Sequence, residues 1–234
     1  MMKFKSFILG LVMVSSVCTV HAQTTPRNAA PAAPQPKIIV GMMVDQMRWD
    51  YLYRFQNRYT ENGFKRLLRE GFSCENTLID YSPTITACGH TCVYTGSVPA
   101  VHGIVGNGWY ERSIGKEIGC VDDESVNLVG SEKGGTGQSP HNNLATTITD
   151  QLRIASNFQS KTVGVAIKDR ASILPAGHAA TGAFWYNGQD GNFVTSTYYM
   201  KELPEWAKRY NNKKVVDTYY KNDWNTLYPI NTYT

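Results

Sequence analysis

The sequence predicts an α/β domain with a mostly parallel sheet flanked by helices. Segments with the apolar pattern of strands alternate along the chain with segments of helical period. Glycine, proline and polar residues separate these segments, as they do at the ends of elements. Alternation of strand and helix is typical of parallel sheets, because helices cover both faces of such a sheet. We therefore expect ligands to bind beyond the carboxyl ends of the strands.

The first half of the predicted domain holds two strands and two helices. Residues 38–44 are almost continuously apolar and end at Asp45, which is the pattern of a strand buried on both faces. Glycines end both helices, because glycine accepts the left-handed backbone of a helix C-terminus. The expected elements are a strand at 38–44, a helix at 51–70 that stops at Gly71, a strand at 77–80, and a helix that begins close to Thr86 and ends at Gly96.

The second half begins with a glycine-rich stretch at 98–140, which is predicted to be a loop. A helix with one apolar face follows and leads into a strand at 162–167; that face consists of Leu144, Ile148, Leu152 and Ala155. Two aromatic strand segments, 184–186 and 193–199, flank the turn residues 187–191. We expect them to form a hairpin that leaves the main sheet.

The first 36 residues are predicted to lie outside the folded domain. Residues 1–22 have a basic start, an apolar run and small residues before a cut after Ala22, as in a secretory signal peptide. The apolar run is shorter than the ~20 residues that span a membrane. Residues 23–36 are rich in proline and alanine and form a flexible leader. The folded part, 37–234, is therefore expected to be exported to the periplasm or beyond, without a membrane partner.

Composition excludes several classes of protein. An apolar content of 42% with 18% charged residues argues against intrinsic disorder. The formal charge of +4 becomes +2 without Lys3 and Lys5, so nothing indicates a nucleic-acid partner. Export would permit disulfides, but the pairing stays open, with Cys74 and Cys120 as one candidate pair. The four cysteines after the predicted signal are Cys74, Cys88, Cys92 and Cys120.

Five polar residues stand where ligands are expected. Asp45 offers hard oxygens for a divalent cation, or a turn cap. Thr86 is either a helix cap or a nucleophile whose phosphoryl group rests on the unpaired amides of the helix start. Lys168 and Arg170 would share a face of an extended strand and grip one anion, or form a solvated strand end. Asn107 is by default a turn residue. Singly, none of the five is specific.

Together these residues resemble one known family. Its motifs occur in order from about residue 37 to the end of the chain, and this collinearity makes the resemblance specific. They are Val44-Asp45-Gln46-Met47-Arg48-Trp49-Asp50-Tyr51, Ser82-Pro83-Thr84-Ile85-Thr86-Ala87-Cys88-Gly89-His90-Thr91, Tyr94-Thr95-Gly96-Ser97-Val98-Pro99, His102-Gly103-Ile104-Val105-Gly106-Asn107 and Ile167-Lys168-Asp169-Arg170. The chain resembles the amino-terminal half of the phosphate-irrepressible alkaline phosphatases. These belong to the alkaline phosphatase superfamily, with the nucleotide pyrophosphatases and phosphodiesterases.

The resemblance implies an alkaline-phosphatase-like fold and hydrolysis of small phosphate monoesters through a phosphothreonine intermediate at a site with two zinc ions (Zn²⁺). It implies that Asp45 is a zinc ligand, that Thr86 attacks phosphorus and also touches zinc, and that Asn107 binds a phosphoryl oxygen. Lys168 and Arg170 match the basic pair that distinguishes monoesterases from diesterases. A monoester dianion carries one more charged oxygen than a diester, so two cations favour it.

The family pattern also requires ligands that this chain does not show. No Asp-His dipeptide occurs, and the histidines after the predicted signal are His90, expected to be a packing residue, and His102, His141 and His178, expected in loops. We therefore expect an amino-terminal fragment, inactive alone, of a full-length parent enzyme. One alternative is a phosphodiesterase or nucleotide pyrophosphatase of the same superfamily. Another, from a different class, is a secreted carbohydrate-binding or inert truncated module.

Overall fold

The structure, a computed structural model, describes residues 36–233. The predicted signal peptide, residues 1–22, and all of the predicted leader except Pro36 lie outside the described residues. The chain divides into a unit that ends at Met42 and a unit that starts at Met43. Residues 36–42 of the first unit contain no helix or strand. The elements named below all belong to the second unit.

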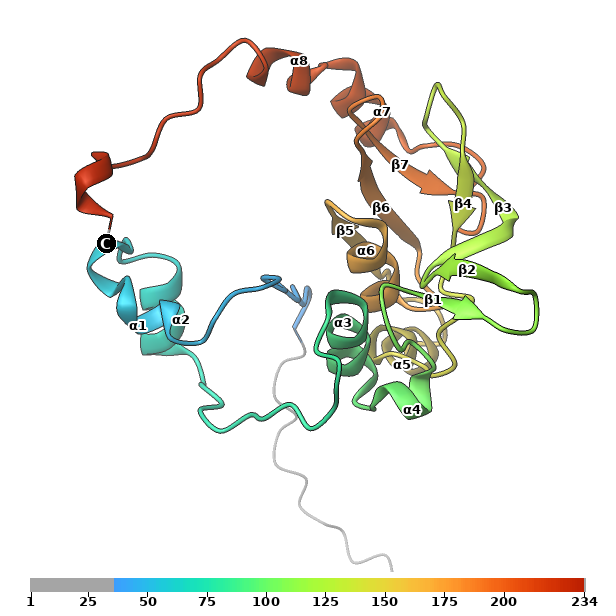
Figure 1. Cartoon of the computed structure of the whole chain (residues 1–234), viewed down its shortest axis with the longest axis horizontal. Coiled ribbons are helices and arrows are strands. Elements are labelled where there is room, and N and C mark those ends of the chain that lie inside the picture. Colours follow the sequence, from blue (N-terminus) through green and yellow to red (C-terminus); the bar gives the residue numbers. More distant parts are fainter. Residues whose placement is uncertain (1–35, 234) are drawn as a thin grey trace, which may run out of the picture. The chain divides into compact units, whose positions relative to one another are not determined.

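Helices and strands alternate irregularly within the second unit (Figure 1). The α-helices are α1 (Tyr51–Arg54), α2 (Phe64–Glu70), α3 (Thr86–Thr95), α4 (Pro99–His102), α5 (Ile148–Ala155), α6 (Asp169–Ala176), α7 (Glu205–Asn212) and α8 (Val215–Tyr219). The strands are β1 (Gly108–Glu111), β2 (Lys116–Gly119), β3 (Asp122–Val129), β4 (Thr136–Gln138), β5 (Val163–Ala166), β6 (Gly182–Asn187) and β7 (Asn192–Ser196). Short 3-10 helices occur at Gln56–Arg58 and Ile230–Thr232. No helix of the described part is long and apolar enough to cross a membrane.

Five strands form one mixed sheet in the order β4-β3-β7-β6-β5, and β1 pairs separately with β2 (Figure 1). β5 and β6 are parallel, with Val165 opposite Phe184, whereas the other described pairs are antiparallel. The α/β class is thus confirmed, while the parallel pairing is limited to β5 and β6 among the described strands.

The predicted hairpin is confirmed as β6 and β7, but its expected position outside the sheet is wrong. β6 lies between β5 and β7 in the sheet. The reason is burial: Ala183, Trp185 and Val194 of the hairpin belong to the main apolar core. An excursion into solvent would expose these side chains at a cost of roughly 25 cal/mol per Å² of apolar surface.

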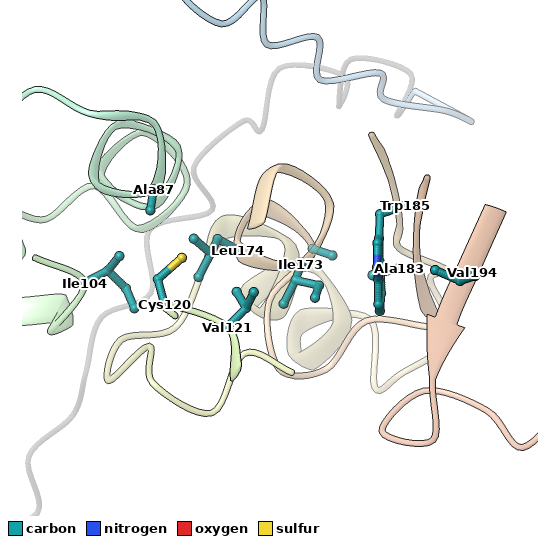
Figure 2. Packing of buried hydrophobic residues seen from close by; sticks show 10 residues of the cluster. Ala87, Ile104, Cys120, Val121, Ile173, Leu174, Ala183, Trp185 and Val194 are labelled. Carbon is teal, nitrogen blue, oxygen red and sulfur yellow. The ribbon is translucent and has the colours of Figure 1, made fainter. Parts of the chain in front are cut away.

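One face of β6 is covered by α6. Ala183 and Trp185 cluster with Ile173 and Leu174 of that helix (Figure 2). The close approach of α6 to β5 requires a glycine, since a Cβ atom at Gly164 would lie 2.2 Å from the carbonyl oxygen of Ser172. This packing fixes the start of α6 directly after the carboxyl end of β5.

The other face of β6 is covered by α7. Phe184 points away from α6 and clusters with Leu203 and with Ala207 of α7. Its ring also meets that of Trp206, with centroids 4.9 Å apart. Because side chains alternate along a strand, one strand serves both layers. Helices therefore flank the sheet on both faces, as predicted.

Two predicted strands are absent from the described residues. Residues 38–44 and 77–80 have no strand assignment, and Ile38 and Met42 are 79% and 80% exposed. A strand exists only when a neighbour satisfies its backbone groups, and no described segment pairs with either one. The apolar pattern was therefore insufficient by itself to make a strand.

The predicted helix at 51–70 is interrupted, and the predicted loop at 98–140 is not simply a loop. α1 ends at Arg54, and α2 begins after Gly63, whose φ of +101° does not fit a helix. Residues 98–140 contain α4 and the strands β1 to β4. Glycines there sit within antiparallel strands, because a Cβ atom at Gly137 would collide with the backbone of Val126.

Local signals predicted three other elements well. α3 runs from Thr86 to Thr95, and Gly96 has the left-handed conformation at its end. β5 lies inside the predicted strand at 162–167. α5 occupies the predicted helix with a capping box formed by Thr147 and Asp150. The outermost predicted residue of its apolar face, Leu144, precedes the helix.

An ion pair between buried Asp150 and partly exposed His178 joins α5 to the segment after α6. Asp150 is 2% exposed and accepts hydrogen bonds from the N–H groups of Thr147 and Ala179. His178 Nδ1 lies 3.5 Å from Asp150 Oδ2, and Nε2 lies 2.9 Å from the carbonyl oxygen of Asn143. Since both ring nitrogens face acceptors, the imidazolium form is favoured.

The pKa values of the pair shift in opposite directions. Burial would raise the pKa of Asp150, but hydrogen bonds from His178, Thr147 and Ala179 outweigh burial and lower it to about 2. The hydrogen bond to Asp150 raises the pKa of His178, against a smaller effect of burial. Asp150 therefore stabilises the fold above pH 3.8 and loses this effect as pH falls toward 2. His178 stabilises it below pH 6.5 and loses this effect as pH rises through its raised pKa.

We predict that Asp150→Asn lowers the free energy of unfolding by about 2 kcal/mol at pH 6, because the buried donors lose their charged acceptor. Urea denaturation between pH 2.5 and 9 measures the free energy of unfolding. In the original chain this free energy should fall at the acidic and at the basic end of the range, whereas in the variant it should change less with pH. Asp223→Asn changes an exposed carboxylate and serves as the control. Equal stability of the Asp150 variant and the control would contradict the role of the pair.

Candidate active site

The site is built on the start of α3. Ile85 precedes the helix with an extended backbone, and its side chain makes no capping hydrogen bond. Thr86, the first helical residue, donates its hydroxyl hydrogen to Asp45, with 3.2 Å between Oγ1 and Oδ2. The structure thus brings together a hydroxyl and a carboxylate that are 41 residues apart. Both were predicted as site residues, and their side chains are in contact.

Asn107 is held against the same helix start. Its Oδ1 accepts the N–H of Ala87 at 3.0 Å. Because the oxygen of the amide is engaged by this bond, the Nδ2 end is left with two hydrogens to donate. The residue is therefore more than the turn residue that its glycine-rich context indicates: it satisfies a helix-start N–H and presents an amide donor beside Thr86.

Lys168 and Arg170 lie where β5 passes into α6, and their predicted arrangement on one extended strand is wrong. β5 ends at Ala166, Lys168 is the extended residue before α6, and Arg170 is already helical. The strand cannot continue because α6 must turn back to cover it. Lys168 is exposed, and no hydrogen bond or ion pair of its ammonium occurs among the described residues.

Arg170 is partly enclosed beside α3. Its side chain is 27% exposed, and Nη1 lies 3.6 Å from Asp169 Oδ1. Its Nε is buried without a partner among the described residues. α6 packs against α3, so Arg170 lies on a helix adjacent to the one that begins at Thr86.

Cys120 connects Arg170 with Asn107. The N–H of Cys120 donates to the carbonyl oxygen of Asn107 at 3.0 Å. Burial raises the pKa of the Cys120 thiol to about 12, and the nearby positive charge of Arg170 opposes this shift. The thiol is therefore neutral, and its place is in the core. A direct contact joins Asp45 and Thr86, and Asn107 binds the N–H of Ala87, the next residue in the chain. Cys120 lies between the backbone of Asn107 and the charge of Arg170.

The four cysteines are free, including the candidate pair Cys74 and Cys120. Cys74 is exposed, whereas Cys120 is buried, so the two occupy different environments. Cys92 instead contacts the ring of His102, with 3.2 Å between Sγ and Nε2.

The histidines do not join the site as metal ligands. His102 is fully buried within α4, not in a loop, and burial lowers its pKa. His178 belongs to the ion pair with Asp150. His141 lies in an exposed turn, as predicted. His90 is 5% exposed, which agrees with packing, but Nδ1 also lies 2.8 Å from the carbonyl oxygen of Thr86. The four-residue spacing on a helix was the signal for this contact.

Zinc fits these residues only in part. Asp45 and Thr86 offer oxygen ligands close together, but a catalytic zinc takes three protein ligands. Within residues 36–233, no group of three His, Cys, Asp or Glu side chains could hold a metal ion. The described residues therefore do not complete a zinc site.

Comparison with known proteins relates the chain to one protein family. Residues 39–232 match the family described as type I phosphodiesterase / nucleotide pyrophosphatase. A relative from Myroides odoratus, named calcium-transporting ATPase, is 61% identical over 85% of this chain and 36% of its own. Alkaline phosphatase PafA from Elizabethkingia meningoseptica is 54% identical over 98% of this chain and 41% of its own. The chain thus spans about two fifths of the length of these relatives.

Solved structures confirm the fold. The crystal structure of wild-type alkaline phosphatase PafA has a TM-score of 0.83 and 58% identity over 87% of this chain and 39% of that chain. A mutant of that enzyme, with a TM-score of 0.82 and 55% identity, covers 86% of this chain and 39% of its own. In it a threonine is changed to serine, and an asparagine, a lysine and an arginine to alanine. The spacing of its threonine and asparagine equals that of Thr86 and Asn107, and its lysine and arginine are spaced like Lys168 and Arg170.

The orientation of the Asn107 amide generates a prediction. Asn107→Asp keeps an acceptor for the Ala87 N–H but removes the donor, whereas Asn107→Ala removes both. We expect the alanine variant to lose about 1 kcal/mol of unfolding free energy and the aspartate variant to lose less. Both should weaken binding of vanadate, a phosphate analogue, at least tenfold, as titration calorimetry would show. Stronger binding by the aspartate variant than by the alanine variant would contradict this orientation, because an acceptor repels the anion.

Proposed function

Because the chain belongs to the type I phosphodiesterase / nucleotide pyrophosphatase family, we propose that it carries the nucleophile and phosphate-binding residues of a phosphate monoesterase. The observation that carries this proposal is the contact of the Thr86 hydroxyl with the Asp45 carboxylate at the start of α3. The complete activity is proposed for the full-length parent. Similarity to alkaline phosphatase PafA supports it.

Thr86 is the proposed nucleophile. Its Oγ1 forms a bond to phosphorus while the bond from phosphorus to the ester oxygen breaks. The released ester oxygen takes a proton from solvent and leaves as the alcohol. Asp45 Oδ2 already accepts the hydrogen of Oγ1 and is placed to receive that proton. The product of this step is a phosphothreonine. Water then attacks phosphorus and gives one proton to solvent, the bond from phosphorus to Oγ1 breaks, and the proton held by Asp45 returns to Oγ1 as inorganic phosphate leaves.

Donors around Thr86 would hold the phosphoryl oxygens. Two kinds of donor would bind an anion beside Thr86: the Nδ2 group of Asn107 and the backbone N–H groups at the start of α3. Arg170 and Lys168 add two positive charges at the start of α6. The charge of a loose phosphoryl-transfer transition state gathers on these non-bridging oxygens. Two cations favour a monoester dianion over a diester, which carries one charge fewer.

Two zinc ions remain a prediction from the resemblance. When bound, such ions neutralise the attacking and leaving oxygens. The described residues supply only part of their ligands, so the proposed steps use the chain's own groups. Export remains a prediction from residues 1–22, and it would give the enzyme access to esters outside the cytoplasm.

The names of relatives provide two competing functions. The family description includes diesters and nucleotide pyrophosphates, and the Myroides relative is named an ATPase. The mutant of alkaline phosphatase PafA supports the monoesterase proposal, because the four residue types chosen there match four proposed site residues in type and spacing. Rates with an aryl monoester, an aryl diester and ATP would separate the three functions.

We predict that Thr86→Ala in the full-length parent abolishes labelling by a ³²P-phosphate monoester, because no hydroxyl remains to bond phosphorus. Thr86→Ser keeps a hydroxyl at this position, so the serine should become labelled. Thr84→Ala, two residues earlier and exposed, is the matched control and should label normally. A labelled intermediate on another residue of the alanine variant would refute the assignment of Thr86.

We predict that Arg170→Ala lowers kcat/KM for the monoester by on the order of 10²–10³, the effect of one lost anion donor. The diesterase rate should fall much less, because a diester lacks the oxygen that this cation binds. Arg112→Ala, in the exposed turn between β1 and β2, is the control. Equal losses for both substrates would indicate that Arg170 only supports the fold.

A further inference from the structure

The first turn of α3 has no side-chain cap at the residue that precedes it. Ile85 contributes no side-chain cap, and the hydroxyl of Thr86 is directed to Asp45. Capping by a serine, threonine or aspartate normally fixes the beginning of a helix. The backbone that carries the proposed nucleophile therefore depends on other contacts.

His90 supplies one of these contacts. It lies one turn after Thr86, is almost completely buried, and places Nδ1 2.8 Å from the carbonyl oxygen of Thr86. A carbonyl oxygen can only accept, so the hydrogen must be on Nδ1. This fixes the tautomer of the ring. The bond is partly buried, which reduces competition from water.

Asn107 supplies the contact on the other end of the same peptide group. The carbonyl of Thr86 and the N–H of Ala87 belong to one planar peptide unit. His90 binds its oxygen, and Asn107 Oδ1 binds its N–H. A peptide plane held at both ends fixes ψ of Thr86 and φ of Ala87. This backbone places Cα and Cβ of Thr86, and the hydrogen bond to Asp45 then directs Oγ1.

From this geometry we infer that His90 is a positioning residue for the nucleophile. Its Nδ1–H group clamps the Thr86–Ala87 peptide and keeps Oγ1 of Thr86 directed toward Asp45 and the phosphoryl group. This inference rests on the proposed function for its catalytic consequence. The clamp itself is a property of the backbone and can be measured without turnover.

The test compares three variants of the chain. His90→Asn keeps an N–H donor, because Nδ2 of asparagine is attached to Cγ as Nδ1 of histidine is. His90→Leu removes the donor and keeps an apolar volume. His102→Asn changes another buried histidine, which contacts Cys92 and not Thr86, and controls for general destabilisation.

Hydrogen exchange followed by NMR reports on the clamp. We expect the amides of Ala87 and Gly89 to exchange about tenfold faster in His90→Leu, relative to the amide of Gly96 at the other end of α3. His90→Asn should restore the ratio found in the original chain. His102→Asn should leave the ratio unchanged even if it lowers overall stability. Equal ratios in the leucine and asparagine variants would overturn the inference.

Kinetics of the full-length parent report on the consequence. His90→Leu should lower kcat on the order of 10²-fold with little change in KM, because a misplaced nucleophile affects the reacting step more than binding. His90→Asn should recover most of kcat. An unchanged kcat in His90→Leu would refute the positioning role. If the parent does not hydrolyse monoesters at all, the proposed function fails, while the exchange ratios still decide whether the clamp exists.

Discussion

The peptide group between Thr86 and Ala87 is the constraint on which the site depends. Its two ends are bound by side chains from α3 itself and from the loop before β1. That loop is fixed in turn, because Cys120 binds the backbone of Asn107 and is buried beside Arg170. Core packing between α3 and α6 therefore sets the position of a hydroxyl at the surface. In this arrangement, the apolar core (Figure 2) is also the support of the site.

The elements that the sequence predicted correctly carry their signals locally. α3 has a glycine at its end that adopts the left-handed conformation, and β5 is a short apolar run between polar residues. The hairpin of β6 and β7 has turn residues between two aromatic segments. Such signals need no knowledge of distant parts of the chain. The site residues were predicted for a related reason, since residue types at the ends of these elements are chemically distinctive, and their roles remain proposals.

The failures concern structure that depends on distant partners. An apolar run at 38–44 could not reveal whether a neighbouring strand would be present. The glycines of 98–140 concealed four strands, one of which, β3, pairs with the distant strand β7. The arrangement of Lys168 and Arg170 was misjudged because α6 begins as soon as β5 ends. The contact of His90 with Thr86 was accessible from spacing alone. His90 was nevertheless interpreted as a packing residue, because packing alone explains a histidine on that helix.

Charge explains why the groups around Thr86 must act together. The carboxylate of Asp45 orients the hydroxyl, but it also repels an approaching phosphate dianion. At the surface, screening weakens this repulsion without removing it. Arg170, Lys168 and the positive ends of α3 and α6 oppose it, and they come from two helices that pack side by side. A single helix start carries only about half a positive charge, which cannot balance a full carboxylate. Attraction of a dianion to this site therefore requires both helices, and a cation bound at Asp45 would strengthen it further.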